Sequence, residues 1–331
     1  MKMLAAMFYA PLDVRLEHRP VPQPDVGEVL LKVVAATTCG TDVKTYLRGH
    51  PLLIRKIPSG FGHEVAGFVA AIGLGVTKCA EGDAIVIANS APCQQCFYCK
   101  RGNFSICEDL LLLNGAYAEY VLVPERIVRL NLYHLEPGSS FVAAALTEPL
   151  ACALHGVDAC EISYGDTVVI LVLLWWFQFS RLVEPTDRNS FLAVQEAILD
   201  KTEARRGADI VIEAVGVPET WELAATLVRP GGLVNFFGGC PSGSRVSFET
   251  RRIHYSELTF KGVFHHTPAY FAQALELIQG RYIDIEALIT ARLPLTSTVD
   301  ALELLVKKQG VKYALIPPDF QQDLLLSEVL L

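Results

Sequence analysis

Four cysteines stand close together in the first third of the chain, in the order Cys93-x2-Cys96-x2-Cys99-x7-Cys107. Thiolates at such spacings can close a tetrahedral site around Zn²⁺, and a site with four protein ligands keeps no position open for chemistry. An iron–sulfur cluster also uses closely spaced cysteines, but the bacterial ferredoxin pattern has its fourth cysteine three residues on, followed by a proline, and this chain has neither. Unliganded thiols are the remaining alternative. We expect a structural zinc site in a lobe at residues 90–110.

A second set of possible metal ligands is dispersed along the chain. Cys39 lies in CGTD, His63 in GHE and Glu148 in TEPLAC. A catalytic zinc takes three protein ligands and leaves its fourth position open, and a thiolate, a neutral imidazole and a carboxylate together balance the charge of the ion. Each residue alone could also be a buried thiol, a turn histidine or a solvated glutamate. Their joint occurrence beside the four-cysteine lobe favours a metal site.

Composition and charge exclude several classes of function. The chain has 331 residues, 51% of them hydrophobic, which is enough for two domains with separate cores. Its net charge of −8 argues against nucleic acid or an anionic membrane as the main partner. The first eleven residues do not resemble a signal peptide, and the longest apolar run, residues 168–177, is shorter than the roughly 20 residues that span a bilayer. We therefore expect a cytoplasmic protein, in which clustered cysteines bind metal rather than form disulfides.

Two patterns of hydrophobic residues divide the chain. Short apolar runs separated by proline and glycine predict an antiparallel, barrel-like domain in the N-terminal part. From about residue 140 helical spacing sets in, and strands then alternate with helices, which predicts crossover units and a parallel sheet. The expected early strands lie at residues 29–40, 64–73, 83–89 and 116–124, and the expected later strands at 166–174, 208–216 and 233–239.

Six stretches carry a resemblance to a known family. They are CGTDVKTY, FGHEVAGFVAAIG, GDAIVIAN, the CQQCFYCKRGNFSIC lobe, NGAYAEYVLVP and LTEPLACALHGV. In order and spacing they resemble the zinc-containing medium-chain alcohol dehydrogenases, and the glutamate in TEPLAC resembles the polyol and threonine dehydrogenase branch. The resemblance covers residues 1–170 and resumes from residue 207 to about 317. It implies an α/β protein, with a GroES-like antiparallel β-barrel catalytic domain at 1–150 and 288–331 and a Rossmann-type doubly wound parallel sheet at 151–287.

The resemblance also implies roles for the dispersed ligands. Cys39, His63 and Glu148 would bind a catalytic zinc, and Glu64 would be a neighbouring carboxylate able to enter the zinc shell. The zinc would act as a Lewis acid that lowers the pKa of a bound alcohol, which then gives a hydride to a nicotinamide. The cofactors implied are therefore two zinc ions, one catalytic and one structural, and NAD or NADP.

The segment that follows Cys39 would contribute three more residues to the same chemistry. By resemblance, Thr41 hydrogen-bonds the alcohol and passes its proton outward, while Asp42 accepts a hydrogen bond from His63 and fixes its tautomer. Lys44 stands where some members of the family carry a histidine in the proton relay. An unperturbed lysine has a pKa of about 10.4, so it conducts protons less readily near pH 7.

The dinucleotide motif of the family is missing from its place. A Gly-x-Gly-x-x-Gly turn should follow the strand that begins after Gly165, because a β-carbon there would crowd the pyrophosphate. Leucines and tryptophans at positions 173–176 stand there instead. A βαβ unit takes roughly 30 residues or more, so residues 165–206 hold about one crossover where the family needs further strands. We expect the domain to be truncated between about 172 and 206, or the sequence to carry a frame error or a recombined segment there.

Other parts of the nucleotide cleft remain recognisable. Gly216, Gly238 and Gly239 end two expected strands, and in the family these positions lie beside the nicotinamide ring. The alternative is that they are ordinary glycines of the turns that follow strands, which the sequence alone does not distinguish. The prediction is a zinc-dependent oxidoreductase that transfers a hydride between a secondary alcohol or polyol and NAD(P), as a homodimer or homotetramer. The alternatives are a zinc-binding pseudoenzyme or damaged scaffold that binds dinucleotide poorly, and a zinc hydrolase or lyase.

Overall fold

The computed structural model describes residues 1–172 and 188–321. Their contacts divide the chain into two compact units, one of residues 1–152 with 266–331 and one of residues 153–265. Within the described residues, no helix combines the length and the apolar character needed to cross a membrane.

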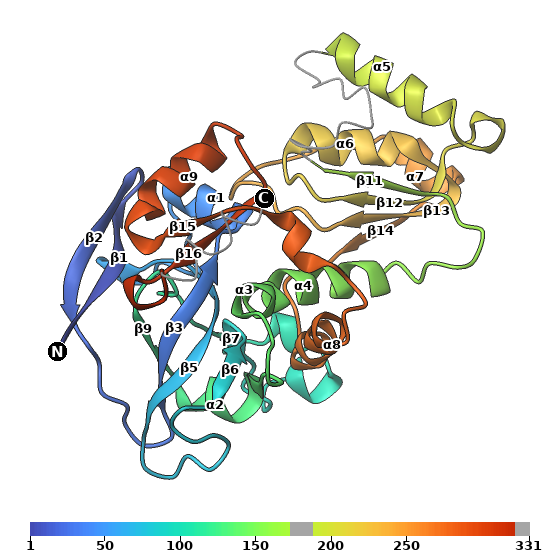
Figure 1. The fold of residues 1–331 in the computed structure, drawn as a ribbon. Helices are drawn as coiled ribbons and strands as arrows, with labels where there is room; N and C mark the ends of the chain where they lie inside the picture. The colour runs from blue at the N-terminus through green and yellow to red at the C-terminus, as the bar shows by residue number, and fades with distance from the viewer. Residues whose placement is uncertain (173–187, 322–331) are drawn as a thin grey trace. The chain divides into compact units, whose positions relative to one another are not determined.

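The first unit is built on antiparallel sheets (Figure 1). Its largest sheet has the order β10-β6-β5-β3-β16-β15, with β9 also paired to β3, and smaller sheets have the orders β2-β1-β4 and β7-β8. All pairs are antiparallel except β15 with β16. The strands are β1 (Lys2–Ala10), β2 (Asp13–Pro20), β3 (Val29–Thr37), β4 (Ser59–Gly60), β5 (Glu64–Ile72), β6 (Ala84–Ile87), β7 (Ser90–Ala91), β8 (Leu111–Leu112), β9 (Tyr120–Val123), β10 (Leu132–His134), β15 (Ile289–Pro294) and β16 (Lys312–Ile316).

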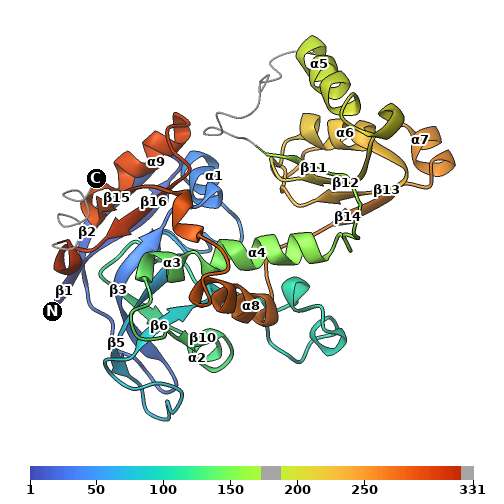
Figure 2. The same ribbon diagram turned by 45° about the vertical axis from the view of Figure 1, so that its right-hand side comes forward.

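Short helices cover these sheets. The N-cap of α3 is Ser140, whose hydroxyl accepts from the backbone N–H of Ala143, as expected for a serine at a helix start. Helix α8 contacts α3, and Figures 1 and 2 both show the two helices side by side. The helices of this unit are α1 (Gly40–Arg48), α2 (Glu125–Asn131), α3 (Phe141–Ala145), α4 (Thr147–Asp158, which continues into the second unit), α8 (Pro268–Gln279) and α9 (Thr298–Val306).

The core of the first unit is formed by apolar side chains from both faces of β3. This strand is buried at Val29, Leu31 and Val33 on one face and at Leu30 on the other, as expected for a strand that is covered on each side. Phe8 and Phe61 stack within the same core, with ring centroids 6.0 Å apart. Burial of these side chains explains why the run from residue 29 lacks a strict polar alternation.

The second unit contains a parallel sheet with the order β11-β12-β13-β14 among its described residues (Figure 2). Helix α6 packs on β12 and β13, and the stacked rings of Trp221 and Phe236 lie 4.1 Å apart in its core. Strands and helices alternate as the sequence predicts. The elements are β11 (Val168–Leu171), α5 (Arg188–Leu199), β12 (Ala208–Glu213), α6 (Pro218–Leu227), β13 (Val228–Phe236), α7 (Thr250–Tyr255) and β14 (Thr259–Gly262).

The predicted fold class is confirmed, since an antiparallel barrel-like part and a parallel α/β part are both present. One difference concerns residues 266–287, which the sequence placed with the parallel sheet and which here contact the first unit. The reason is the apolar side of α8, where Leu275 and Ile278 are buried, and Ile278 packs with Leu146 and Ile285. The predicted truncation between 172 and 206 stays a prediction, because residues 173–187 lie outside the described part of the chain.

Candidate functional site

The four clustered cysteines lie on the loop between β7 and β8 with their sulfurs close to one another. All four Sγ atoms are within 4.8 Å of each other. The Cys93–Cys99 and Cys96–Cys107 pairs are 3.9 and 4.0 Å apart. Tetrahedral zinc with Zn–S bonds of about 2.3 Å separates its sulfurs by about 3.8 Å, so this spacing fits the ion and not a disulfide.

Backbone N–H groups of the same loop point at these sulfurs. Cys93 Sγ accepts from the N–H of Cys96 at 3.3 Å, and Cys107 Sγ accepts from the N–H of Cys93 at 3.2 Å. The backbone N–H of Cys99 lowers the pKa of the Cys96 thiol to about 6. Such donors favour the thiolate form, which is the form that binds metal.

Cys39 is placed by a helix cap. It is the N-cap residue of α1, where its Sγ accepts from the N–H of Thr41 at 3.4 Å and its own N–H donates to Asp42 Oδ2 at 2.9 Å. This reciprocal arrangement is a capping box, with a thiol in the usual place of a hydroxyl. The cap therefore fixes the direction of the Cys39 side chain before any metal is bound.

Sheet register brings a second segment to this cap. Glu64 is the first residue of β5 and lies opposite Thr37, near the end of β3. His63 precedes it, and ligand atoms of Cys39, His63 and Glu64 all lie within 4.8 Å of one another. A half-buried thiol thus meets a buried imidazole and a buried carboxylate, which is a donor set that suits zinc.

Asp42 faces the ring of His63 from α1. Its Oδ1 lies 3.1 Å from His63 Nδ1, within ion-pair distance although outside the angular range of a good hydrogen bond, and both side chains are buried. Burial alone would raise the pKa of Asp42, but the charge of His63 and hydrogen bonds from its neighbours outweigh it, and the pKa lies below its usual value. With Nδ1 held by this carboxylate, Nε2 is the ring nitrogen that is left for a metal.

Glu64 has a cationic partner that the sequence did not suggest. Lys312 Nζ lies 2.7 Å from both carboxylate oxygens and also donates to the Thr38 carbonyl at 2.6 Å. The Thr37 hydroxyl donates a hydrogen bond to the Glu64 carboxylate. Burial lowers the pKa of Lys312, but the charge of Glu64 more than reverses this effect. The only sequence signal was a lysine inside the apolar run VKYALIP.

Glu148 lies outside the set of mutually close ligand atoms that contains Cys39. It sits in the first turn of α4, where Cys152 Sγ and His266 Nε2 are 3.7 and 3.9 Å from its Oε1. Burial raises the pKa of Glu148 to about 7. The charge of His63 lowers this pKa and the charge of Glu64 raises it. The sequence assigned Glu148 as the third ligand and Glu64 as its neighbour. Glu64 directly follows His63 at the start of β5 and is the carboxylate whose ligand atom lies within 4.8 Å of those of Cys39 and His63, while the role of Glu148 as third ligand stays a prediction.

The predicted proton relay lies on the same helix as Asp42. Thr41 and Lys44 are both half-buried residues of α1, and the N–H of Thr41 donates a hydrogen bond to Cys39 Sγ. Their relay function stays a prediction.

The three predicted cofactor glycines lie at the carboxyl ends of β12 and β13 in the second unit. A β-carbon on Gly216, which has φ +80°, would lie 2.6 Å from the carbonyl oxygen of Gly239, and one on Gly238 would lie 2.4 Å from the nitrogen of Gly216. The two loops are therefore in backbone contact, which only glycine allows. The buried Glu213, which the sequence did not single out, accepts from the N–H groups of Val215 and Gly216 at 2.9 Å and holds the first loop.

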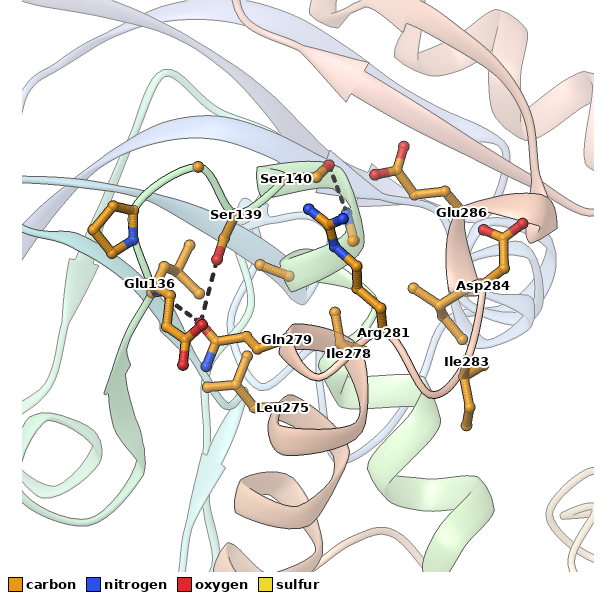
Figure 3. Close-up of a pocket in the computed structure, with 16 residues that line it drawn as sticks. Glu136, Ser139, Ser140, Leu275, Ile278, Gln279, Arg281, Ile283, Asp284 and Glu286 are labelled. Atoms are coloured by element: carbon orange, nitrogen blue, oxygen red, sulfur yellow. Dashed lines mark hydrogen bonds between the residues drawn. The ribbon is translucent and has the colours of Figure 1, made fainter.

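The first unit also contains a cavity of about 480 Å³ (Figure 3). Its walls come from residues 135–144 and 275–286, and the labelled side chains include Arg281, Asp284 and Glu136. None of the candidate metal ligands lines it. The size of a cavity therefore does not mark the site of chemistry in this unit.

Two family models match the sequence, an alcohol dehydrogenase GroES-like domain at residues 25–131 and a zinc-binding dehydrogenase domain at residues 180–280. The sorbitol dehydrogenase of Bacillus subtilis is 27% identical over 351 residues, which covers 95% of this chain and 97% of that protein. The D-xylulose reductase A of Aspergillus oryzae is 26% identical, covering 90% and 92%.

Solved structures give a similar result. A protein from Sinorhizobium meliloti 1021, described as a zinc-binding dehydrogenase and solved with NADP, has 27% identity and a TM-score of 0.76, covering 96% of this chain and all of that one. The 2R,3R-butanediol dehydrogenase of Bacillus subtilis has a TM-score of 0.79 at 24% identity, covering 95% and 99%, and so shows a shared fold.

Proposed function

Because this chain belongs to the zinc-containing medium-chain alcohol dehydrogenases, in the polyol dehydrogenase branch, we propose that it transfers a hydride between a secondary alcohol or polyol and NAD or NADP. It is a zinc-dependent oxidoreductase of the alcohol and polyol class. The relatives do not favour the alternative of a pseudoenzyme. The observation that carries the proposal is the donor set formed by the half-buried Cys39 and the buried His63 and Glu64.

The catalytic zinc in this proposal is held by Cys39 and His63 together with a carboxylate. The donor set favours Glu64 as that carboxylate, and Glu148 remains a further ligand candidate from α4. When bound, the zinc supplies a Lewis acid for the alcohol oxygen and the nicotinamide supplies the hydride acceptor. The structural zinc is held by the four cysteines between residues 93 and 107.

The remaining residues of the site orient its ligands and move a proton. Asp42 faces Nδ1 of His63 and would hold the ring so that Nε2 could bind the metal. Lys312 neutralises Glu64, which reduces the negative charge around the zinc. Thr41 would take the proton from the alcohol, and Lys44 would pass it outward.

The cofactor would lie at the carboxyl edge of the parallel sheet, where open α/β sheets bind their ligands. At this edge Gly239 is exposed and a β-carbon there would meet no atom within 4 Å, which fits close approach by the nicotinamide half of a dinucleotide. The NADP in the Sinorhizobium meliloti protein supports this proposal. The predicted place of the adenosine half falls on residues 173–187, outside the described part.

Further proposals concern the partners, the cellular location and the oligomeric state of the enzyme. The net charge of −8 favours a small-molecule substrate over nucleic acid or an anionic membrane, and we propose that the enzyme works in the cytoplasm. The family resemblance implies a homodimer or homotetramer, assembled through the sheet around residues 233–239.

One experiment tests the function directly. The purified protein is titrated with NADH and with NADPH while nicotinamide fluorescence is followed, and zinc is counted per chain in the same sample. Two zinc ions with tight binding of either cofactor would support the proposal. Two zinc ions with no detectable cofactor binding would refute the dehydrogenase function of this chain. The matched control is Cys39→Ser, which should lose one zinc ion and keep cofactor binding.

A further inference from the structure

We propose that Tyr117 is a positioning residue of the metal centre, because its hydroxyl holds Asp42 and Asp42 holds His63. The Tyr117 hydroxyl lies 2.5 Å from Asp42 Oδ2, and both side chains are buried. This inference rests on the proposed zinc site at Cys39 and His63. Tyr117 comes from the run NGAYAEYVLVP, which the sequence indicated as a strand and as part of the family resemblance without a role for this tyrosine.

The Tyr117 hydroxyl has one proton and two acceptors within reach. The Thr37 carbonyl oxygen is 3.2 Å away, whereas Asp42 Oδ2 is 2.5 Å away and carries charge. Hydrogen bonds to ionised acceptors are the shorter and stronger ones, so the proton goes to Asp42. Asp42 Oδ2 also accepts the backbone N–H of Cys39 at 2.9 Å. Two donors therefore occupy Oδ2 and leave Oδ1 for His63.

This division of the two carboxylate oxygens sets the orientation of the carboxylate. With Oδ2 fixed by Tyr117 and Cys39, Oδ1 stays 3.1 Å from Nδ1 of His63. The proton of His63 is then kept on Nδ1, and Nε2 is free to bind metal. Without the Tyr117 hydroxyl, a buried carboxylate would lose one of its hydrogen-bond donors and could turn away from the ring.

The ring of Tyr117 is fixed by the segment that carries His63. Gly62 has φ +85°, and a β-carbon there would lie 2.4 Å from Cδ1 of the Tyr117 ring. The N–H of Tyr117 donates to the Phe61 carbonyl at 2.9 Å, and its carbonyl accepts from Ala6 at 2.8 Å. A phenylalanine would fill the same space, so packing alone does not require the hydroxyl.

The test removes only this hydroxyl. Tyr117→Phe keeps the ring beside Gly62, and the matched control is Tyr313→Phe. Tyr313 is also buried, at 5% exposure, but its hydroxyl donates to the Gln309 carbonyl at 2.7 Å. Zinc affinity is measured by competition with a chelator, and the four-cysteine site of each chain serves as an internal standard for folding. We expect the catalytic site of Tyr117→Phe to bind zinc about 10-fold more weakly, as is typical for partners of metal-binding histidines. The control should match the wild type.

A double variant tests whether Tyr117 acts through Asp42. If it does, Asp42→Asn combined with Tyr117→Phe should bind zinc no more weakly than Asp42→Asn alone. Zinc affinity of Tyr117→Phe within twofold of the wild type would overturn the inference, as would an additional loss in the double variant. A wild-type chain that binds only one zinc would overturn the proposed function itself. That result is distinguishable from a failure of the Tyr117 inference, because it would be seen in the wild-type chain.

Discussion

Replacing Lys312 by methionine would leave the carboxylate of Glu64 without its cation. Lys312 Nζ is 2.7 Å from both oxygens of Glu64, whose side chain is 0% exposed, and the lysine side chain is 12% exposed. The same ammonium group donates to the Thr38 carbonyl at 2.6 Å. Methionine has a similar length and fills most of the space, so the main effect is the loss of charge and hydrogen bonds.

The expected cost follows from the burial of the pair. Removing one partner of a buried ion pair costs about 3–5 kcal/mol, because it leaves an uncompensated charge. A zinc ion at Cys39 would offset part of this cost, since it would lie close to the unpaired Glu64. The loss in free energy of unfolding should therefore be larger in protein stripped of zinc than in zinc-loaded protein.

Urea unfolding followed by far-UV circular dichroism measures this loss. The double variant Lys312→Met with Glu64→Gln should recover most of it, because charge and counter-charge are removed together. The matched control is Lys307→Met, since Lys307 is 62% exposed and pairs with Glu303 at 3.4 Å; such surface pairs contribute about 0–1 kcal/mol. The reasoning would be refuted if Lys312→Met cost no more than Lys307→Met, or if the double variant were less stable than the single one.

Three further predictions concern metal and backbone. Cys39→Ser should abolish turnover with little change in melting temperature, whereas Cys96→Ser should lower the melting temperature, because only the four-cysteine site holds a lobe together; equal losses in the two variants would contradict this. Gly62→Ala should destabilise the protein by about 2–5 kcal/mol in urea unfolding, since φ is +85° and the new methyl group would meet the Tyr117 ring, and an unchanged midpoint would refute this. Arg281→Gly should raise stability by about 1 kcal/mol in the same assay, because Arg281 has φ +55° just after α8; a fall would count against it.

Local spacing let the sequence predict much of the chemistry. The four cysteines lie within fifteen residues, so a single loop brings them together and no long-range contact is needed. The capping box at Cys39, which the sequence analysis did not predict, is equally local, because Asp42 lies one helical turn further on. The change from apolar strands to alternating strands and helices likewise predicted an antiparallel and a parallel part. In these cases the interacting groups are near neighbours along the chain.

The tertiary structure decided which distant groups complete the metal centre. Lys312 reaches Glu64 across a sequence separation of 248 residues, and Tyr117 reaches Asp42 across 75. It also brought Glu64 close to Cys39, because the register of β3 and β5 sets Glu64 opposite Thr37. Residue type and local spacing therefore determined what the ligands could be. Strand register and helix packing determined which buried charge each one faces, because a buried group is stabilised only by the partners that the fold brings to it.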